Sequence, residues 1–209
     1  MAPAPHIPQP DGAPYMDRLL RLAHLASRGG AWFGGAIVAA AALVISTDVL
    51  MRKLFDTTLG GASEISGYVL AISTTWALAL TLLDRAHVRI DSLYVLLPTR
   101  LCALLDILAL LSFMVFAGFL TWQGWVIFHQ SAVLGSRSLT PLATPLAIPQ
   151  FFWLAGFAFF LLVMILLLAR ALIALATGRI EDVHRLLGSR TAMQELEQAV
   201  QERERYKDD

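Results

Sequence analysis

The chain has 209 residues, of which 57% are hydrophobic and only 15% are charged, whereas an average soluble domain has roughly 25% charged residues. This balance excludes an intrinsically disordered protein, which combines high charge with low hydrophobicity, and it argues against an ordinary soluble enzyme. The formal net charge is zero, so no overall basic field attracts nucleic acid. The single cysteine, Cys102, excludes an internal disulfide and a thiolate metal site.

The first 14 residues are rich in proline and alanine and lack the charged start and apolar middle of a secretory signal. We expect residues 1–14 to form a disordered tail, and Met16 is an alternative start. Residues 15–28 then place arginines on one helical face and leucines on another. This segment fits either an amphipathic helix lying on the cytoplasmic membrane surface or a cytoplasmic extension of the first membrane helix. Its arginines are Arg18, Arg21 and Arg28.

Four uncharged stretches follow, each long enough to cross a bilayer, for which a helix needs about 20 mostly apolar residues. The sequence therefore predicts an all-α integral membrane protein with four transmembrane helices. We expect these spans near residues 30–50, 65–83, 103–128 and 149–175. With residues 15–28 they define a membrane domain over 15–178, and a charged, helical cytoplasmic tail follows over 179–209.

The lysines and arginines are distributed unequally between the two sides that four spans create. Of the 16 in the chain, 13 lie in the N-terminal segment, the second loop or the region from Arg170 onward. The first and third loops hold only Arg52, Lys53 and Arg137. Because basic residues near span ends remain in the cytoplasm, both termini are expected there. The first and third loops then face the periplasm of a bacterial inner membrane.

Within the first span, Gly30 and Gly34 form a GxxxG pair, and Gly35 and Ala39 follow with the same spacing. Small residues at this spacing let two helix backbones approach closely in lipid. The sequence therefore predicts a helix-packing surface here.

The next two elements carry signals at their ends. Ser63 is a candidate N-cap of the second helix, and Glu64 lies in its first turn, where a carboxylate favours the helix dipole. Pro149 suits the first turn of the fourth helix, where its missing N–H is not needed.

The sequence lacks three common motifs of nucleotide-binding proteins and zinc proteases. It contains no Walker phosphate loop, no HExxH and no glycine-rich dinucleotide turn, so we expect neither an enzyme nor a cofactor in this chain. Ionisable residues inside a span are functional candidates, and two occur. Asp106 could act within the third span or reach an arginine such as Arg100 at the interface. Asp48 could take part in ion transport, but it lies four residues before Arg52, where it can form a structural ion pair.

Three segments resemble the small, four-span permease subunit of tripartite ATP-independent periplasmic (TRAP) transporters. The first has Arg52 and Phe55 followed by Ser63-Glu64 at the start of the second helix. The next is Trp76 followed by AHVRID at 86–91. The third is LAIPQFFWLAGF at 146–157, with Pro149 starting the last helix and Gly156 inside it. The resemblance extends over residues 43–170.

The resemblance implies a function and partners. In this family the small subunit binds a large membrane subunit, which carries the sodium and substrate sites, and a periplasmic binding protein delivers an organic acid. Uptake is driven by sodium and not by ATP. The small subunit is thought to brace the large one and to help dock the binding protein, so sodium ions are expected on the large subunit.

The same resemblance suggests two sets of site residues. Arg52, Glu64 and Arg137 are candidates for docking the binding protein by charge, or they anchor the chain at the membrane interface. A second set lies in the cytoplasmic loop and either contacts the large subunit and lipid headgroups or only fixes the topology. These residues are His87, Arg89 and Asp91.

Two other functions remain open at this point. A homo-oligomeric exporter would use Asp48 or Asp106 for transport, although such exporters usually centre on an ionisable residue within the first span. A membrane anchor without transport activity would use residues 179–209 as a helix for a partner.

Overall fold

The computed structural model describes residues 14–58, 60–84 and 99–177. This part of the chain forms four helices: α1 (Pro14–Phe55), α2 (Ala62–Leu83), α3 (Thr99–Leu134) and α4 (Ala147–Ala176). All four are long and apolar enough to cross a membrane, and each predicted span lies inside one of them. The described residues include no strand beyond one isolated bridge in the α3–α4 loop.

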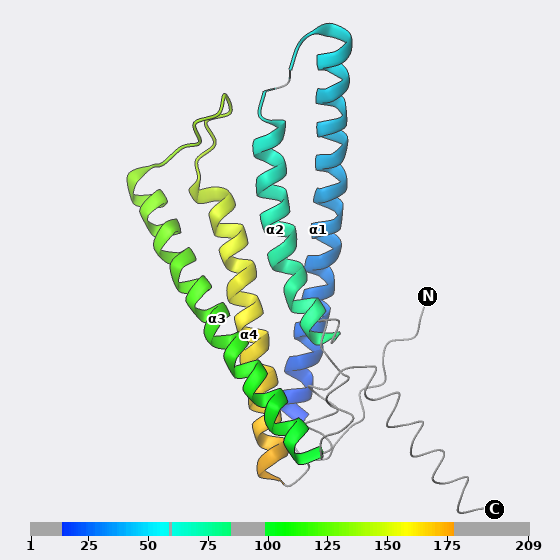
Figure 1. Cartoon of the computed structure of the whole chain (residues 1–209), viewed down its shortest axis with the longest axis vertical. Coiled ribbons are helices and arrows are strands. Elements are labelled where there is room, and N and C mark those ends of the chain that lie inside the picture. The colour runs from blue at the N-terminus through cyan, green and yellow to red at the C-terminus, as the bar shows by residue number, and fades with distance from the viewer. Residues whose placement is uncertain (1–13, 59, 85–98, 178–209) are drawn as a thin grey trace, which may run out of the picture.

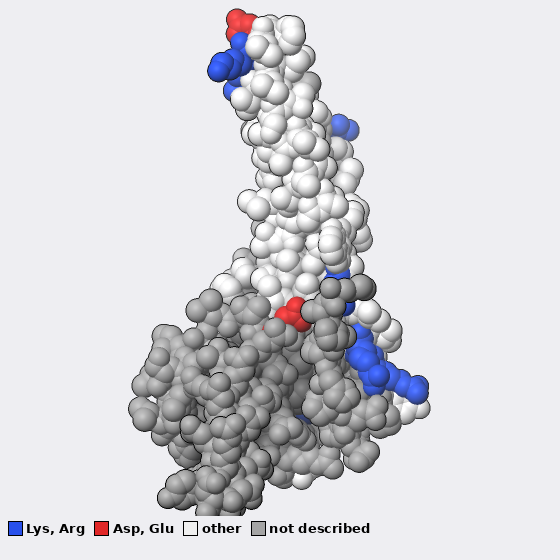
Figure 2. Space-filling model, turned by 90° about the vertical axis from the view of Figure 1, so that its right-hand side faces the viewer, with Lys and Arg blue, Asp and Glu red and all other residues white. Residues whose placement is uncertain are grey.

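The helices form two hairpins, α1 with α2 and α3 with α4, which spread apart toward the end that carries the α1–α2 and α3–α4 loops (Figure 1). We call this end the outer end and the opposite end the inner end. Helix α4 is central, because it packs against α3, α2 and α1. In Figure 2 the middle of the visible face is largely white, with charged atoms toward its ends, as expected for a band surrounded by lipid.

Residues 15–28 are part of α1 and not a separate helix, so the extension of the first membrane helix is the correct alternative. Ala23 and Ser27 in this segment are buried, and Ala23 belongs to the main apolar cluster. The same packed face of α1 therefore continues from the predicted span into the extension.

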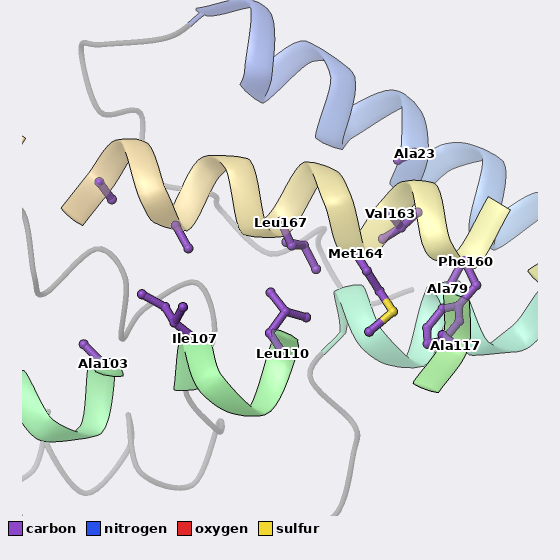
Figure 3. Close-up of a cluster of buried hydrophobic side chains, with 12 residues drawn as sticks. Ala23, Ala79, Ala103, Ile107, Leu110, Ala117, Phe160, Val163, Met164 and Leu167 are labelled. Carbon is purple, nitrogen blue, oxygen red and sulfur yellow. The ribbon is translucent and has the colours of Figure 1, made fainter. Parts of the chain in front are cut away.

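The main apolar cluster lies along one face of α4. Phe160, Val163, Met164 and Leu167 recur at helical spacing, and α3 packs its own buried residues against them (Figure 3). Phe160 meets Phe113 edge to face at 5.6 Å between ring centroids. Close packing of this kind, rather than burial from water, holds membrane helices together.

Trp76 of α2 joins three helices, because its large ring lies between two glycines. A Cβ on Gly30 of α1 would come within 2.8 Å of the Trp76 ring, and one on Gly156 of α4 would come within 3.1 Å of it. The indole N–H donates to the carbonyl oxygen of Phe152 at 3.1 Å. The predicted packing surface at Gly30 and Gly34 is thus confirmed: a Cβ on Gly34 would lie 3.2 Å from Ser73.

Of the two predictions about helix ends, the one for α2 is wrong and the one for α4 agrees with the structure. The prediction of Ser63 as N-cap is wrong: α2 begins at Ala62 after Gly61, and no side chain caps it. Gly61 takes this position because its φ of 111° is unfavourable for any other residue. Pro149 lies in the first turn of α4, as predicted.

Candidate functional site

The outer end of α1 contains a buried carboxylate held by two donors. Asp48 is only 4% exposed. Arg52 Nη2 donates to its Oδ2 at 2.9 Å, and Thr58 Oγ1 donates to its Oδ1 at 2.9 Å. The Gly60 N–H in turn donates to Thr58 Oγ1 at 3.2 Å. The ion pair suggested by the spacing of Asp48 and Arg52 is therefore present, and it also ties the helix end to the loop.

Glu64 is directed toward the other outer loop. Tyr68 Oη donates to Glu64 Oε1 at 2.8 Å, and the carboxylate faces the hydroxyl side chains of Ser138 and Thr144 in the α3–α4 loop. Glu64 Oε2 is buried and has no hydrogen-bond partner within the described residues. The side chain of Glu64 thus extends from α2 to the α3–α4 loop and is only partly open to solvent.

Arg137 closes the α3–α4 loop. Its Nη1 donates to the carbonyl oxygen of Ala143 at 3.2 Å, beside two backbone hydrogen bonds of 3.0 Å that pair Ser138 with Thr144 and Leu146 with Ser136. These bonds make the loop a short, closed hairpin. Leu139 at its tip is fully exposed.

The two outer loops touch each other through glycines. Gly60 has a φ of 61°, and a Cβ there would lie 3.9 Å from Pro141. A Cβ on Gly61 would overlap the Leu142 side chain, so Leu142 packs directly on the Gly61 backbone. We refer to this contact together with the Glu64 contact as the outer cap.

Two contacts at the inner end were missed by sequence reasoning. His24 Nε2 lies 3.0 Å from Asp84 Oδ1 and joins α1 to the residue that ends α2. Ser27, which is fully buried, donates to the carbonyl oxygen of His24 at 2.9 Å. No local pattern relates His24 and Asp84, which are 60 residues apart.

Two charged residues are buried on the facing helices α3 and α4. Asp106 is fully buried in the second turn of α3. Arg170 was counted with the basic residues that flank the fourth span. It lies within α4 and is 6% exposed. Ionisable residues inside a membrane protein usually face the bundle interior, as both of these do.

The remaining predicted residues cannot be placed in the same way. His87, Arg89 and Asp91 lie outside the described residues, as do residues 1–13 and the tail from 178 onward. Within the described ranges no group of three or more histidine, cysteine or acidic side chains could hold a metal ion.

Four long apolar helices, with polar networks near their ends, define a multi-pass helical membrane protein. The comparison with protein families then assigns the chain more narrowly. The sequence model described as "Tripartite ATP-independent periplasmic transporters, DctQ component" matches residues 41–174. The chain therefore belongs to this family and is a small membrane component of a TRAP transporter. Searches of curated proteins and of solved structures found no match to this chain.

Proposed function

We propose that this chain is the small membrane subunit of a sodium-driven, binding-protein-dependent transporter that takes up an organic acid. In this proposal it braces the large permease subunit and helps to dock the periplasmic binding protein. Both termini are cytoplasmic and the outer cap faces the periplasm of the inner membrane. The family match over residues 41–174 carries the proposal, because it includes the outer part of α1, all of α2 and α3, and nearly all of α4.

The bracing role is supported by the outward faces of the hairpins. Large apolar side chains are exposed along α1 and α3, among them Phe33, Leu43, Leu108 and Val115. In a membrane these faces are available to lipid or to another helical subunit. Since α1 and α3 belong to different hairpins, a large subunit could contact either hairpin without disturbing the apolar cluster along α4.

The docking role is supported by how the outer residues are held. Arg52 is fixed by Asp48, Glu64 by Tyr68, and Arg137 by the Ala143 carbonyl. Charged groups that are already held in place lose little conformational entropy when a partner binds. The guanidinium of Arg52 remains largely open to solvent even in its ion pair, since its side chain is 65% exposed.

The experiment is a pull-down of the full chain from its native membranes in mild detergent, with mass spectrometry of the copurifying proteins. We expect a roughly equimolar, many-span membrane protein. Recovery of copies of this chain alone would contradict the proposal and favour the exporter. Recovery of a soluble cytoplasmic protein in its place would favour the anchor.

A further inference from the structure

The inner end of α1 carries three exposed arginines. Arg18, Arg21 and Arg28 are exposed, and none of them pairs with a carboxylate among the side chains that the structure describes, which do not include that of Asp17. At 100° per residue they fall within about 80° of each other around the helix axis. Arg52, at the other end of the same helix, is in contrast bound to Asp48.

An aromatic and an apolar side chain share this face with the arginines. Leu25 lies between Arg21 and Arg28 and is 64% exposed, and Trp32, one turn beyond Arg28, is 78% exposed. A tryptophan indole combines an apolar ring with one N–H donor, which suits the boundary between headgroups and acyl chains. Counted from the inner end, this face of α1 thus presents Arg21, Leu25, Arg28 and Trp32 in turn.

The surface beyond Trp32 is open. Gly35 and Ala39 continue the same face, and both are exposed. A Cβ on Gly35 would meet no atom within 4 Å. This second pair of small residues does not pack inside the bundle. An extended hydrocarbon chain can therefore lie against the helix backbone beside the Trp32 ring.

The spacing of these residues along α1 matches the thickness of a bilayer. The 19 uncharged residues between Arg28 and Asp48 are about 28 Å long as a helix, close to the roughly 30 Å of the hydrocarbon core. Arg28 therefore lies at the level of the lipid phosphates, and Trp32 lies about 6 Å deeper. Arg21 lies about 10 Å further out, at the limit of one screening length of roughly 8–10 Å.

We propose that this face of α1 binds an anionic phospholipid. The Arg28 guanidinium holds the phosphate with two parallel hydrogen bonds, and Arg21 adds longer-range attraction. The Trp32 indole lies at the glycerol-ester level, and an acyl chain follows the helix past Gly35. The occupant is a lipid with a net negative headgroup, because the face offers three exposed cations beside an exposed indole.

The test uses the full chain, with the membrane partners that copurify with it, in lipid nanodiscs. Phosphatidylglycerol or phosphatidylcholine with brominated acyl chains is included at equal mole fractions, and quenching of tryptophan fluorescence is measured. The signal of Trp32 is the difference between the wild type and Trp32→Phe. We expect stronger quenching by brominated phosphatidylglycerol, and Arg28→Gln should weaken that preference roughly fivefold.

Lys53→Gln is the matched control, because Lys53 is an exposed cation at the opposite end of α1. It should leave the preference at Trp32 unchanged. Equal quenching by the two lipids in the wild type, or an equal loss in both variants, would overturn the proposal. A Trp32 signal that neither lipid quenches would also overturn it, since a protein partner would then cover this face.

Discussion

At the outer end of the molecule, one buried and one partly buried carboxylate have hydrogen-bond donors close to them. Asp48 has a guanidinium and a hydroxyl, and Glu64 has the Tyr68 hydroxyl. Taking a carboxylate out of water costs several kcal/mol unless such groups replace the lost hydration. At the outer end, a single substitution can therefore act through the partner that it leaves behind.

Arg52 allows this effect to be separated from docking. Arg52→Gln should lower the free energy of unfolding by about 1–2 kcal/mol, because Asp48 loses its charged donor while Thr58 remains. The double variant Asp48→Asn/Arg52→Gln should regain most of that stability. If Arg52 docks the binding protein, uptake at limiting binding-protein concentration should fall in both variants. Recovery of uptake in the double variant would show that Arg52 serves only Asp48.

At the scale of single residues, the sequence predicts contacts between side chains about one helical turn apart and few contacts between more distant residues. The pair of Asp48 and Arg52 could be predicted, because residues four apart share a helix face. The contribution of Thr58 depends on the path of a loop, and the pairing of His24 with Asp84 depends on how two helices meet. Arg170 was counted with the flanking basic residues although the predicted fourth span already extended to residue 175, and its burial depends on how α4 packs in the bundle.

At the scale of the helices, small residues decide which faces meet. In α1, Gly30 and Gly34 face α2, whereas Gly35 is rotated away and has open space around it. Both pairs of small residues had the same spacing in the sequence, so spacing alone could not tell which one packs. The large partner Trp76 makes the distinction, because its ring needs the room that the Gly30 backbone leaves.

Alanine at these two glycines should have opposite effects. Gly30→Ala places a methyl group within 2.8 Å of the Trp76 ring, and we expect a loss of about 1–3 kcal/mol from forced repacking. Gly35→Ala adds the same group in open space and should be neutral or slightly stabilising, since alanine favours helix more than glycine does. Unfolding in mixed detergent micelles measures both changes. Equal losses in the two variants would contradict the packing described for α1 and α2.

At the scale of the whole molecule, the two hairpins are held by different means along their length. The apolar cluster along α4 joins them at the inner half, and the outer cap joins them where the helices have spread apart (Figure 1). The number of helices and their approximate spans could be predicted from uncharged length alone. Their arrangement could not, because α4 is apolar around its whole circumference and periodicity gives no direction to such a helix.

Leu142 and Leu139 test the outer cap as a matched pair from one loop. Leu142 rests on the Gly61 backbone, whereas Leu139 is fully exposed at the tip. Leu142→Ala should lower the free energy of unfolding by about 1–2 kcal/mol, the range for a partly buried side chain. Leu139→Ala should change it by less than about 0.5 kcal/mol. The same loss in both variants would show that the two loops do not support each other.

Helix α1 runs without a break from Pro14 to Phe55, and this continuity has a mechanical consequence. The 15 residues up to Arg28 extend about 22 Å from the inner edge of the uncharged segment. Gly29 and Gly30, residues at which a helix can bend, lie just inside this edge, and Gly30 is held against the Trp76 ring of α2. A change of about 10° in the tilt of α1 in the bilayer would therefore move its first turn sideways by about 4 Å, if the helix stays rigid. A change of tilt within the membrane would in this way be enlarged at the inner end of α1.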